Sequence, residues 1–338
     1  MQAIQVFEPG KLEVVTKDKP EIERPDDVFV KIKAVGICGS DMHIYHGSNP
    51  FTVYPRVIGH EVSGEVASVG SRVSTLQPGD QVALEPISYC GECYACRKGR
   101  PNVCVNLEVF GVHRDGGMRE FMVAPADKWH KVSESISFEA AALAEPMTIG
   151  AQATMRGNVQ KGDTVLIMGA GPTGLSCLLL AKQYGATTFI SDFNQERLDY
   201  AKSVGADHLL NPGEEDIEKM IADETDQELA NVVIDAVGTA GTFEQAVTLA
   251  SVAGNVVTLG FNEQLSSIAS LLLTKKELTI AGSRLQTHQF KSVIEEVNKG
   301  NIDPEAMISH TFHFQQVKDA FALLENPNKE VRKIVLTF

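Results

Sequence analysis

The alternation of hydrophobic and polar positions changes character near residue 160. Up to about residue 135 the chain contains short apolar runs bounded by glycine and proline, among them DDVFVKIKAVG, VSGEVASVG and GDQVALEP. Runs of this length and composition are typical of β-strands. We therefore predict a β-rich region for the first part of the chain.

From about residue 160, strand-like apolar runs alternate with segments of helical period, in the order DTVLIMGAG, TGLSCLLLAKQYGA, TTFISD, NQERLDYAKSVGA, ANVVIDAVG, GTFEQAVTLASVAG and NVVTLGF. This alternation predicts a parallel, doubly wound α/β sheet. The tail differs again, with a helical candidate FQQVKDAFALLEN and a final strand-like KIVLTF. We expect the tail to rejoin the first region.

Composition narrows the class of protein. The 338 residues suffice for two domains of about 150 residues each, and 43% hydrophobic with 22% charged residues is typical of a soluble globular protein. No apolar run approaches the ~18 residues of a membrane span, and MQAIQVFEPGK lacks the layout of a signal peptide, so we expect a cytoplasmic protein. The formal net charge of -14 repels nucleic acid and anionic membranes, which favours a small-molecule substrate.

Three glycines in VLIMGAGPTG follow a predicted strand and open a predicted helix: Gly169, Gly171 and Gly174. In this spacing the first glycine makes a tight turn, the second leaves room for a pyrophosphate, and the third allows close packing of helix on strand. Asp192 ends the next strand about 20 residues on, where a carboxylate accepts hydrogen bonds from an adenosine ribose. The alternative is that Asp192 caps the helix beginning near Asn194. The loop and Asp192 together favour dinucleotide binding.

Four of the six cysteines lie in one short segment: Cys90, Cys93, Cys96 and Cys104. Intracellular thiols are normally reduced, so a metal is favoured over disulfides. Four thiolates complete a tetrahedral zinc shell, which makes such a site structural. A nucleic-acid-binding zinc module would need a basic surface, which this acidic chain offers only locally in RKGR, and iron–sulfur ligation is a further alternative. Cys177, in the helix after the glycine loop, is expected in the core.

Single ligand-type side chains lie on three other segments: Cys38 in GICGSDMH, His60 in VIGHEV and Glu145 in AAALAEPMTIGAQA. Glu145 stands beside Pro146 in an apolar, helix-like run, and glutamate is rarely buried unless it is paired or binds a metal. Each residue alone has an ordinary interpretation, as a packed cysteine, a packed histidine or an exposed helix-end glutamate. Together they offer the sulfur, nitrogen and oxygen donors of an open, catalytic zinc site.

The motifs GICGSD, GHE, the four-cysteine lobe, EP at 145–146 and GAGPTG occur in this order over the whole chain. In this combination the sequence resembles the zinc-dependent medium-chain alcohol dehydrogenases. Within them it looks most like the sorbitol, threonine and sugar-acid dehydrogenase branch. The stretches GVHRDGGMREF and HIYHGSNPFTVYPRVIGHE are similar to the starvation-sensing and galactonate-oxidising members.

The resemblance implies an α/β fold with a GroES-like, β-rich catalytic domain at 1–150 and 290–338 and a Rossmann NAD-binding domain at 151–289. It implies two zinc ions per chain, one catalytic and one structural, the latter in a lobe at about 88–106. It also implies hydride transfer between an alcohol and the nicotinamide of NAD, and a homodimer or homotetramer.

Three side chains are implied by the resemblance as ligands of the catalytic zinc: Cys38, His60 and Glu145. Glu61 would lie nearby and exchange with water or substrate, and Asp41 is a candidate to orient His60. Ser40 would receive the proton of the substrate hydroxyl, and His43 would pass it to solvent through the cofactor ribose. Other branches have cysteine as the third ligand, so the oxygen of Glu145 predicts a more weakly held zinc.

Preferences for cofactor and substrate follow from the same comparison. Asp192 would repel a 2′-phosphate, which predicts NAD rather than NADP, although Arg197 is near enough in sequence to reach such a phosphate. The branch predicts a polyol or sugar acid oxidised at a secondary alcohol. Candidate pocket residues are His46, His113, Glu120 and Arg284. Two other functions stay open, a zinc-free quinone reductase-like activity, against which the ligand set argues, and a dinucleotide-binding regulatory protein.

Overall fold

The computed structural model describes residues 1–326 and 329–338. Within these residues the chain forms two compact units, one made of Met1–Glu145 and Phe290–Phe338 and the other of Pro146–Gln289. The first division falls between Glu145 and Pro146, inside one helix, α4 (Ala144–Arg156).

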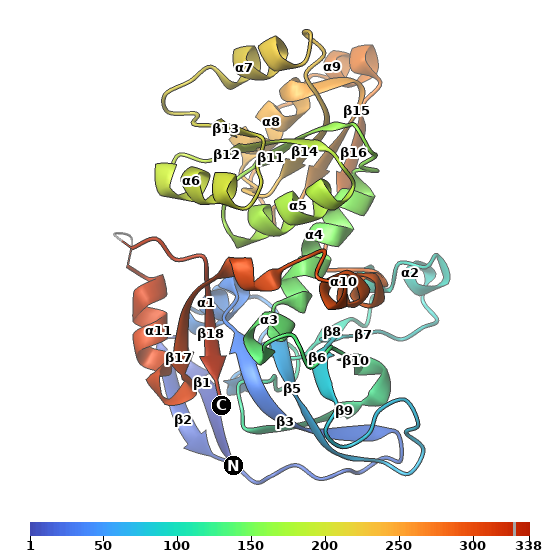
Figure 1. Cartoon of the computed structure of the whole chain (residues 1–338), viewed down its shortest axis with the longest axis vertical. Helices are drawn as coiled ribbons and strands as arrows, with labels where there is room; N and C mark the ends of the chain where they lie inside the picture. Colours follow the sequence, from blue (N-terminus) through green and yellow to red (C-terminus); the bar gives the residue numbers. More distant parts are fainter. Residues whose placement is uncertain (327–328) are drawn as a thin grey trace. The chain divides into compact units, whose positions relative to one another are not determined.

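The first unit is built mainly on antiparallel strands (Figure 1). Its strands are β1 (Gln2–Glu8), β2 (Lys11–Thr16), β3 (Asp27–Gly36), β4 (Arg56–Val57), β5 (Glu61–Val69), β6 (Gln81–Leu84), β7 (Ile87–Ser88), β8 (Glu108–Val109), β9 (Phe121–Pro125), β10 (Trp129–Lys131), β17 (Ile308–His313) and β18 (Lys333–Thr337). Its helices are α1 (Gly39–Tyr45), α2 (Tyr94–Arg97), α3 (Phe138–Ala142), α10 (Gln289–Asn298) and α11 (Val317–Leu324).

The largest sheet of this unit has the order β10-β6-β5-β3-β18-β17, and β9 also pairs with β3. In its centre β18 pairs antiparallel with β3, with Val335 opposite Gly36. The C-terminal strands therefore complete a sheet that the N-terminal part of the chain begins. Two smaller sheets have the orders β2-β1-β4 and β7-β8.

The apolar run that contains Glu145 forms two helices. Helix α3 begins after Ser137, whose hydroxyl accepts the N–H of Ala140, and α4 begins at Ala144. Pro146 thus lies in the first turn of α4, where its missing N–H costs no intrahelical hydrogen bond. Glu145 lies in the same turn.

The second unit contains a parallel sheet of order β13-β12-β11-β14-β15-β16. Its strands are β11 (Thr164–Met168), β12 (Thr187–Ser191), β13 (His208–Leu210), β14 (Ala230–Asp235), β15 (Ala250–Thr258) and β16 (Thr279–Gly282). Its helices, besides most of α4, are α5 (Pro172–Gln183), α6 (Gln195–Ser203), α7 (Ile217–Glu224), α8 (Ala240–Leu249) and α9 (Ser270–Lys276). This confirms the doubly wound sheet. Its order reverses between β11 and β14, and ligands of such sheets bind beyond the carboxyl ends of the strands at this point.

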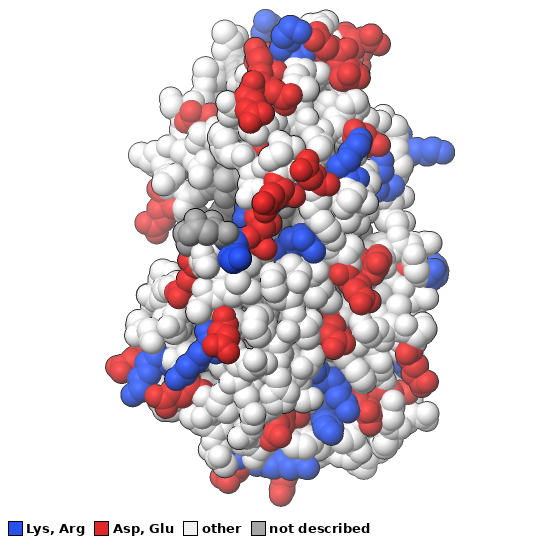
Figure 2. Space-filling view, turned by 60° about the vertical axis from the view of Figure 1, so that its left-hand side comes forward, with Lys and Arg blue, Asp and Glu red and all other residues white. Residues whose placement is uncertain are grey.

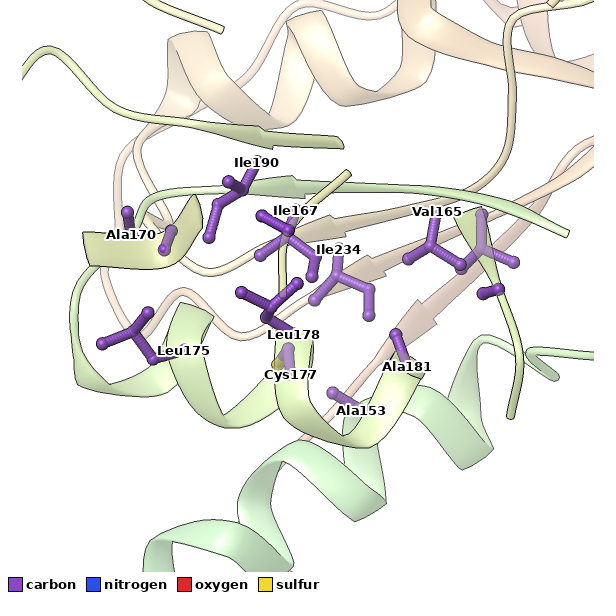
Figure 3. Packing of buried hydrophobic residues seen from close by; sticks show 14 of the residues in the cluster. Ala153, Val165, Ile167, Ala170, Leu175, Cys177, Leu178, Ala181, Ile190 and Ile234 are labelled. Atoms are coloured by element: carbon purple, nitrogen blue, oxygen red, sulfur yellow. The ribbon is translucent and has the colours of Figure 1, made fainter. Parts of the chain in front are cut away.

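Successive side chains of β11 face opposite layers, as the geometry of a strand requires. Val165 and Ile167 pack with α5 and α6 in one buried cluster (Figure 3). Leu166 and Met168 pack with α7 and α8 in another. Cys177 is fully buried in the first cluster, which confirms that it is a core residue.

The described residues agree with two expectations drawn from the composition, which concern a membrane span and a basic surface. No helix among the described residues is long and apolar enough to cross a membrane. On the face that Figure 2 draws, Lys and Arg side chains lie singly or in small groups among Asp and Glu side chains. This face therefore lacks the broad basic patch by which nucleic acid is attracted.

Candidate functional site

The four clustered cysteines meet in the first unit, around the short helix α2. Their sulfur atoms all lie within 4.8 Å of one another. The separations are 3.6 Å for Cys93 and Cys96, 3.8 Å for Cys93 and Cys104, and 3.4 Å for Cys90 and Cys104. A tetrahedron with zinc–sulfur bonds of about 2.3 Å has edges of about 3.8 Å. The sulfurs are thus spaced as a zinc shell requires and too far apart for disulfides, whose S–S bond is about 2.05 Å.

Backbone N–H groups also point at these sulfurs. Cys104 Sγ accepts the N–H of Cys90 at 3.4 Å and that of Asn106 at 3.3 Å. Hydrogen bonds from the backbone of Cys96 and Val105 lower the pKa of Cys93 to about 6. Burial, by contrast, raises the pKa of Cys96 to about 12. The backbone therefore favours the thiolate, the form of cysteine that binds metal, at Cys93 and not at every cysteine of the lobe.

A second group of ligand-type side chains lies where two neighbouring strands meet. Cys38 follows β3, and His60 immediately precedes β5, whose first residue is Glu61. Because β3 and β5 pair antiparallel with Gly36 opposite Glu61, the end of one strand lies beside the start of the other. The ligand atoms of Cys38, His60 and Glu61 consequently lie within 4.8 Å of one another.

Asp41 fixes the two segments that carry Cys38 and His60. Its fully buried carboxylate accepts the N–H of Cys38 at 2.9 Å and the N–H of Gly59 at 3.0 Å. Its Oδ1 lies 3.9 Å from Nδ1 of His60, which is too long for a hydrogen bond. Asp41 therefore positions the backbone on both sides of the group, whereas direct orientation of His60 is not what the geometry shows.

Glu145 faces the same group from the start of α4. It is buried, and burial raises its pKa to about 7, with the charge of Glu61 adding to the rise and that of His60 opposing it. Burial lowers the pKa of His60, but Cys38, Asp41 and Glu145 outweigh it and hold the pKa well above its ordinary value. Among the described residues, the set with all ligand atoms within 4.8 Å includes Glu61 and not Glu145. Most ligand-type side chains of this group are anionic when ionised, and a bound cation would balance their negative charge.

Lys333, which the sequence reasoning missed, lies beside these carboxylates. Its Nζ donates to Oε1 of Glu61 at 2.5 Å and to the carbonyl of Ile37 at 3.3 Å, and the side chains of Lys333 and Glu61 are 4% and 0% exposed. In the sequence, Lys333 directly follows Arg332 and is the first residue of the apolar strand KIVLTF. Charged side chains are almost never fully buried unless they are paired. A lysine in a buried strand therefore needs an anionic partner nearby.

The donor set tests whether a zinc ion fits. His60 Nδ1 and Glu61 Oε2 are buried and have no hydrogen-bond partner among the described residues. Buried polar atoms are normally satisfied by protein, water or metal. Sulfur, nitrogen and carboxylate oxygen are the donors that zinc takes in catalytic sites. The residues present fit zinc.

Two of the predicted site residues lie on α1, Ser40 near the ligand group and His43 at the surface. Ser40 Oγ lies 3.4 Å from Nε2 of His60. His43 lies one turn further along α1, is exposed, and has Nδ1 2.9 Å from Oγ of Ser48. The predicted relay residues therefore follow one helix from the ligand group to the surface.

The glycine loop of the second unit lies at the carboxyl end of β11. Gly169 adopts φ +95°, and a Cβ on Gly174 would lie 1.8 Å from the carbonyl oxygen of Gly169, so both positions require glycine. Gly171 begins α5 without a side-chain cap, and nothing lies within 4 Å of where its Cβ would be. Uncapped N–H groups at a helix N-terminus, with open space before them, suit a phosphate.

Asp192 lies against this loop. Its Oδ2 accepts the N–H of Ala170 at 2.9 Å, and its Oδ1 accepts that of Asn194 at 2.9 Å. Asn194 itself caps α6, so the capping alternative for Asp192 is wrong. Arg197 Nη1 lies 3.8 Å from Oδ2 of Asp192.

The four candidate residues for the substrate pocket have partners within the protein. The pairs are His46 with Glu325 Oε1 at 3.2 Å, Glu120 with the N–H of Gln2 at 2.6 Å, His113 with the N–H of Val109 at 3.1 Å, and Arg284 with the ring of Phe261 at 5.8 Å. The Glu325 partner of His46 directly follows α11, the Gln2 partner of Glu120 is in β1, and neither partner belongs to the ligand group. His113 also stacks on the half-exposed Phe51, with ring centroids 5.7 Å apart.

Comparison with known proteins gives consistent matches. The family described as Alcohol dehydrogenase GroES-like domain matches residues 24–134, and the family described as Zinc-binding dehydrogenase matches residues 172–299. The Starvation-sensing protein RspB of Escherichia coli (strain K12) is 41% identical over 340 residues, covering 100% of this chain and 99% of the relative. L-galactonate-5-dehydrogenase of the same strain is 36% identical over 329 residues, covering 96% of each. The crystal structure of the alcohol dehydrogenase rspB from Escherichia coli CFT073, complexed with NADH, matches with a TM-score of 0.94 at 40% identity and covers 100% of this chain and 99% of that one.

Proposed function

Because this chain belongs to the zinc-dependent medium-chain alcohol dehydrogenases, we propose that it oxidises a secondary alcohol of a polyol or sugar acid with NAD, reversibly, to a ketone. The observation that carries the proposal is the group formed by the partly buried Cys38, the buried His60 and two buried carboxylates, with Ser40 beside it.

We assign Cys38, His60 and Glu145 as the ligands of the catalytic zinc. Glu61 is paired with Lys333 and is not assigned as a resident ligand. The 2.5 Å contact between Lys333 and Glu61 supports this division, because a carboxylate already paired with a buried ammonium is a weaker donor to a metal. When bound, zinc supplies Lewis acidity that lowers the pKa of an alcohol hydroxyl toward neutrality.

The proton of the substrate hydroxyl would leave through Ser40. Its Oγ is 3.4 Å from His60 Nε2, and a hydroxyl both accepts and donates, so it can pass a proton onward. His43 is exposed one turn further on α1, and its imidazole ring offers both a donor and an acceptor nitrogen. The chain thus supplies both ends of a path from the buried group to water.

The glycine loop and Asp192 would bind NAD. The pyrophosphate would lie on the uncapped start of α5, and the similar structure from Escherichia coli CFT073 holds NADH. Asp192 keeps a carboxylate at the end of β12, where it would repel the 2′-phosphate of NADP. Asp192→Asn removes the charge, so we expect the ratio of catalytic efficiency with NAD to that with NADP to fall by about tenfold, which corresponds to about 1.4 kcal/mol. Equal efficiencies with both cofactors in the unaltered protein would refute the preference.

Two considerations support a polyol or sugar acid as substrate. The relative L-galactonate-5-dehydrogenase carries a sugar acid in its name, and polar pocket residues reject substrates that lack a matching hydroxyl. His113 and Arg284 are the remaining candidates for this role.

The test is NADH formation by the purified protein with a panel of polyols, sugar acids and ethanol. We expect a polyol or sugar acid to give the highest catalytic efficiency, and ethanol to be poor. A sugar acid that loses its advantage in Arg284→Ala would favour recognition of a carboxylate. If ethanol exceeds every other substrate, the proposed substrate class is wrong, and if NADH binds but nothing is turned over, the regulatory alternative gains.

We also propose a homo-oligomer in a reducing compartment such as the cytoplasm. Strand β16 is an outer strand of the parallel sheet, and its Ile280 is 38% exposed. Edge strands offer unpaired N–H and C=O groups to a second chain. Light scattering should give the mass of a dimer or tetramer, and a monomer at working concentration contradicts the proposed homo-oligomer.

The proposed compartment follows from the cysteines. The four free thiols of the lobe need reducing conditions until metal binds.

A further inference from the structure

A serine of the dinucleotide-binding helix is inserted into the first turn of α4. The hydroxyl of Ser176, on α5, donates to the carbonyl of Pro146 at 2.7 Å and accepts the N–H of Gly150 at 3.2 Å. In a regular α-helix this carbonyl and this N–H, four residues apart, would bond to each other. Ser176 therefore bridges a position of the α4 hydrogen-bond ladder, and insertions of this kind bend or open helices locally.

The close approach of the two helices depends on Gly150. A Cβ at this position would lie 2.3 Å from Oγ of Ser176 and 2.6 Å from its backbone carbonyl. Ser176 is completely buried, and all three residues belong to the same compact unit. A side chain larger than that of glycine at position 150 would therefore push the two helices apart.

Glu145 immediately precedes Pro146, in the turn that Ser176 holds. We propose that Ser176 is a positioning residue for Glu145: through the Pro146 carbonyl it sets the direction in which the first turn of α4 presents this carboxylate to the zinc. The inference rests on the proposed function, since it takes Glu145 as a zinc ligand.

The experiment compares Ser176→Ala with Thr154→Ala as a matched control. Thr154 is also completely buried, and its hydroxyl donates to the carbonyl of Gly150 at 3.0 Å, but it lies further along α4 and bridges nothing to α5. Both variants lose a buried hydroxyl that bonds to α4, so both should lower the midpoint of chemical denaturation. The dissociation constant of the catalytic zinc is measured by chelator competition. The Cys38→Ser variant serves as the reference, because it holds only the zinc of the cysteine lobe.

We expect Ser176→Ala to raise the zinc dissociation constant about tenfold, as loss of a group that orients a ligand typically does. Thr154→Ala should leave it unchanged. In a Glu145→Ala background, Ser176→Ala should have no further effect on zinc affinity, because the residue that it positions is gone.

Equal zinc affinities of Ser176→Ala and Thr154→Ala would overturn the inference, as would an undiminished effect of Ser176→Ala when Glu145 is absent. If Glu145→Ala alone leaves zinc affinity unchanged, the ligand assignment fails, and the inference fails with it. If Glu145→Ala weakens zinc and Ser176→Ala does not, only the inference fails.

Discussion

At the scale of single residues, the two carboxylates near the proposed zinc are held in different ways. Glu61 is paired with the ammonium of Lys333, and both side chains are almost wholly buried. Glu145 is buried at the start of a helix, and burial raises its pKa. A carboxylate whose ionised form is costly has more to gain from a divalent cation than one already paired. This difference is the basis for assigning Glu145, and not Glu61, as the resident ligand.

Lys333→Met should leave Glu61 as a buried, unpaired charge. Breaking a buried ion pair from one side typically costs about 3–5 kcal/mol, so we expect a loss of this size in the free energy of unfolding, measured with urea. The double variant Lys333→Met with Glu61→Gln should recover much of this loss, because it removes both charges. Additive losses in the double variant would show that the two side chains do not interact as the 2.5 Å contact indicates.

The sequence predicts single residues well where their partners are close in the chain, and poorly where they are distant. The glycine spacing and the four-cysteine lobe are local, and the structure assembles both at the expected places. Lys333 and Glu61 are 272 residues apart, and they meet only because β18 enters the sheet beside β3, which no local pattern specifies. Ser176 and Pro146, 30 residues apart, meet through a helix crossing that sequence periodicity cannot place.

At the scale of elements, the strand β11, the glycine loop and α5 form a unit in which two glycines have different tasks. A Cβ on Gly174 would overlap the Gly169 carbonyl, whereas a Cβ on Gly171 would meet nothing within 4 Å. The need for Gly174 therefore comes from the protein itself, and the need for Gly171 would come from the dinucleotide.

Gly174→Ala should consequently lower both stability and NADH affinity, with a loss of several kcal/mol from the steric overlap. Gly171→Ala should leave the thermal midpoint nearly unchanged and weaken NADH binding, measured by fluorescence titration, by at least about tenfold. A Gly171→Ala protein that binds NADH normally would mean that the pyrophosphate does not approach this position.

At the scale of the whole molecule, two independent donor sets predict two zinc ions per chain. The cysteine lobe and the group around His60 share no residue. Elemental analysis should therefore give two zinc ions for the unaltered protein and one for Cys38→Ser, which retains the lobe. Cys104→Ser should lose the zinc of the lobe, because three thiolates no longer complete the tetrahedral shell. A single zinc that survives Cys38→Ser would contradict a zinc at the group around His60.

The most direct test of the account is the turnover of Glu145→Ala, assayed as NADH formation with the best substrate of the panel. If Glu145 is a ligand of the catalytic zinc, the variant should fold, retain the zinc of the cysteine lobe and bind NADH as the unaltered protein does. It should lose nearly all turnover, by a factor of about 10³ or more, because the group that activates the alcohol is no longer held in place. Full activity in Glu145→Ala would contradict the assignment on which the proposed mechanism depends.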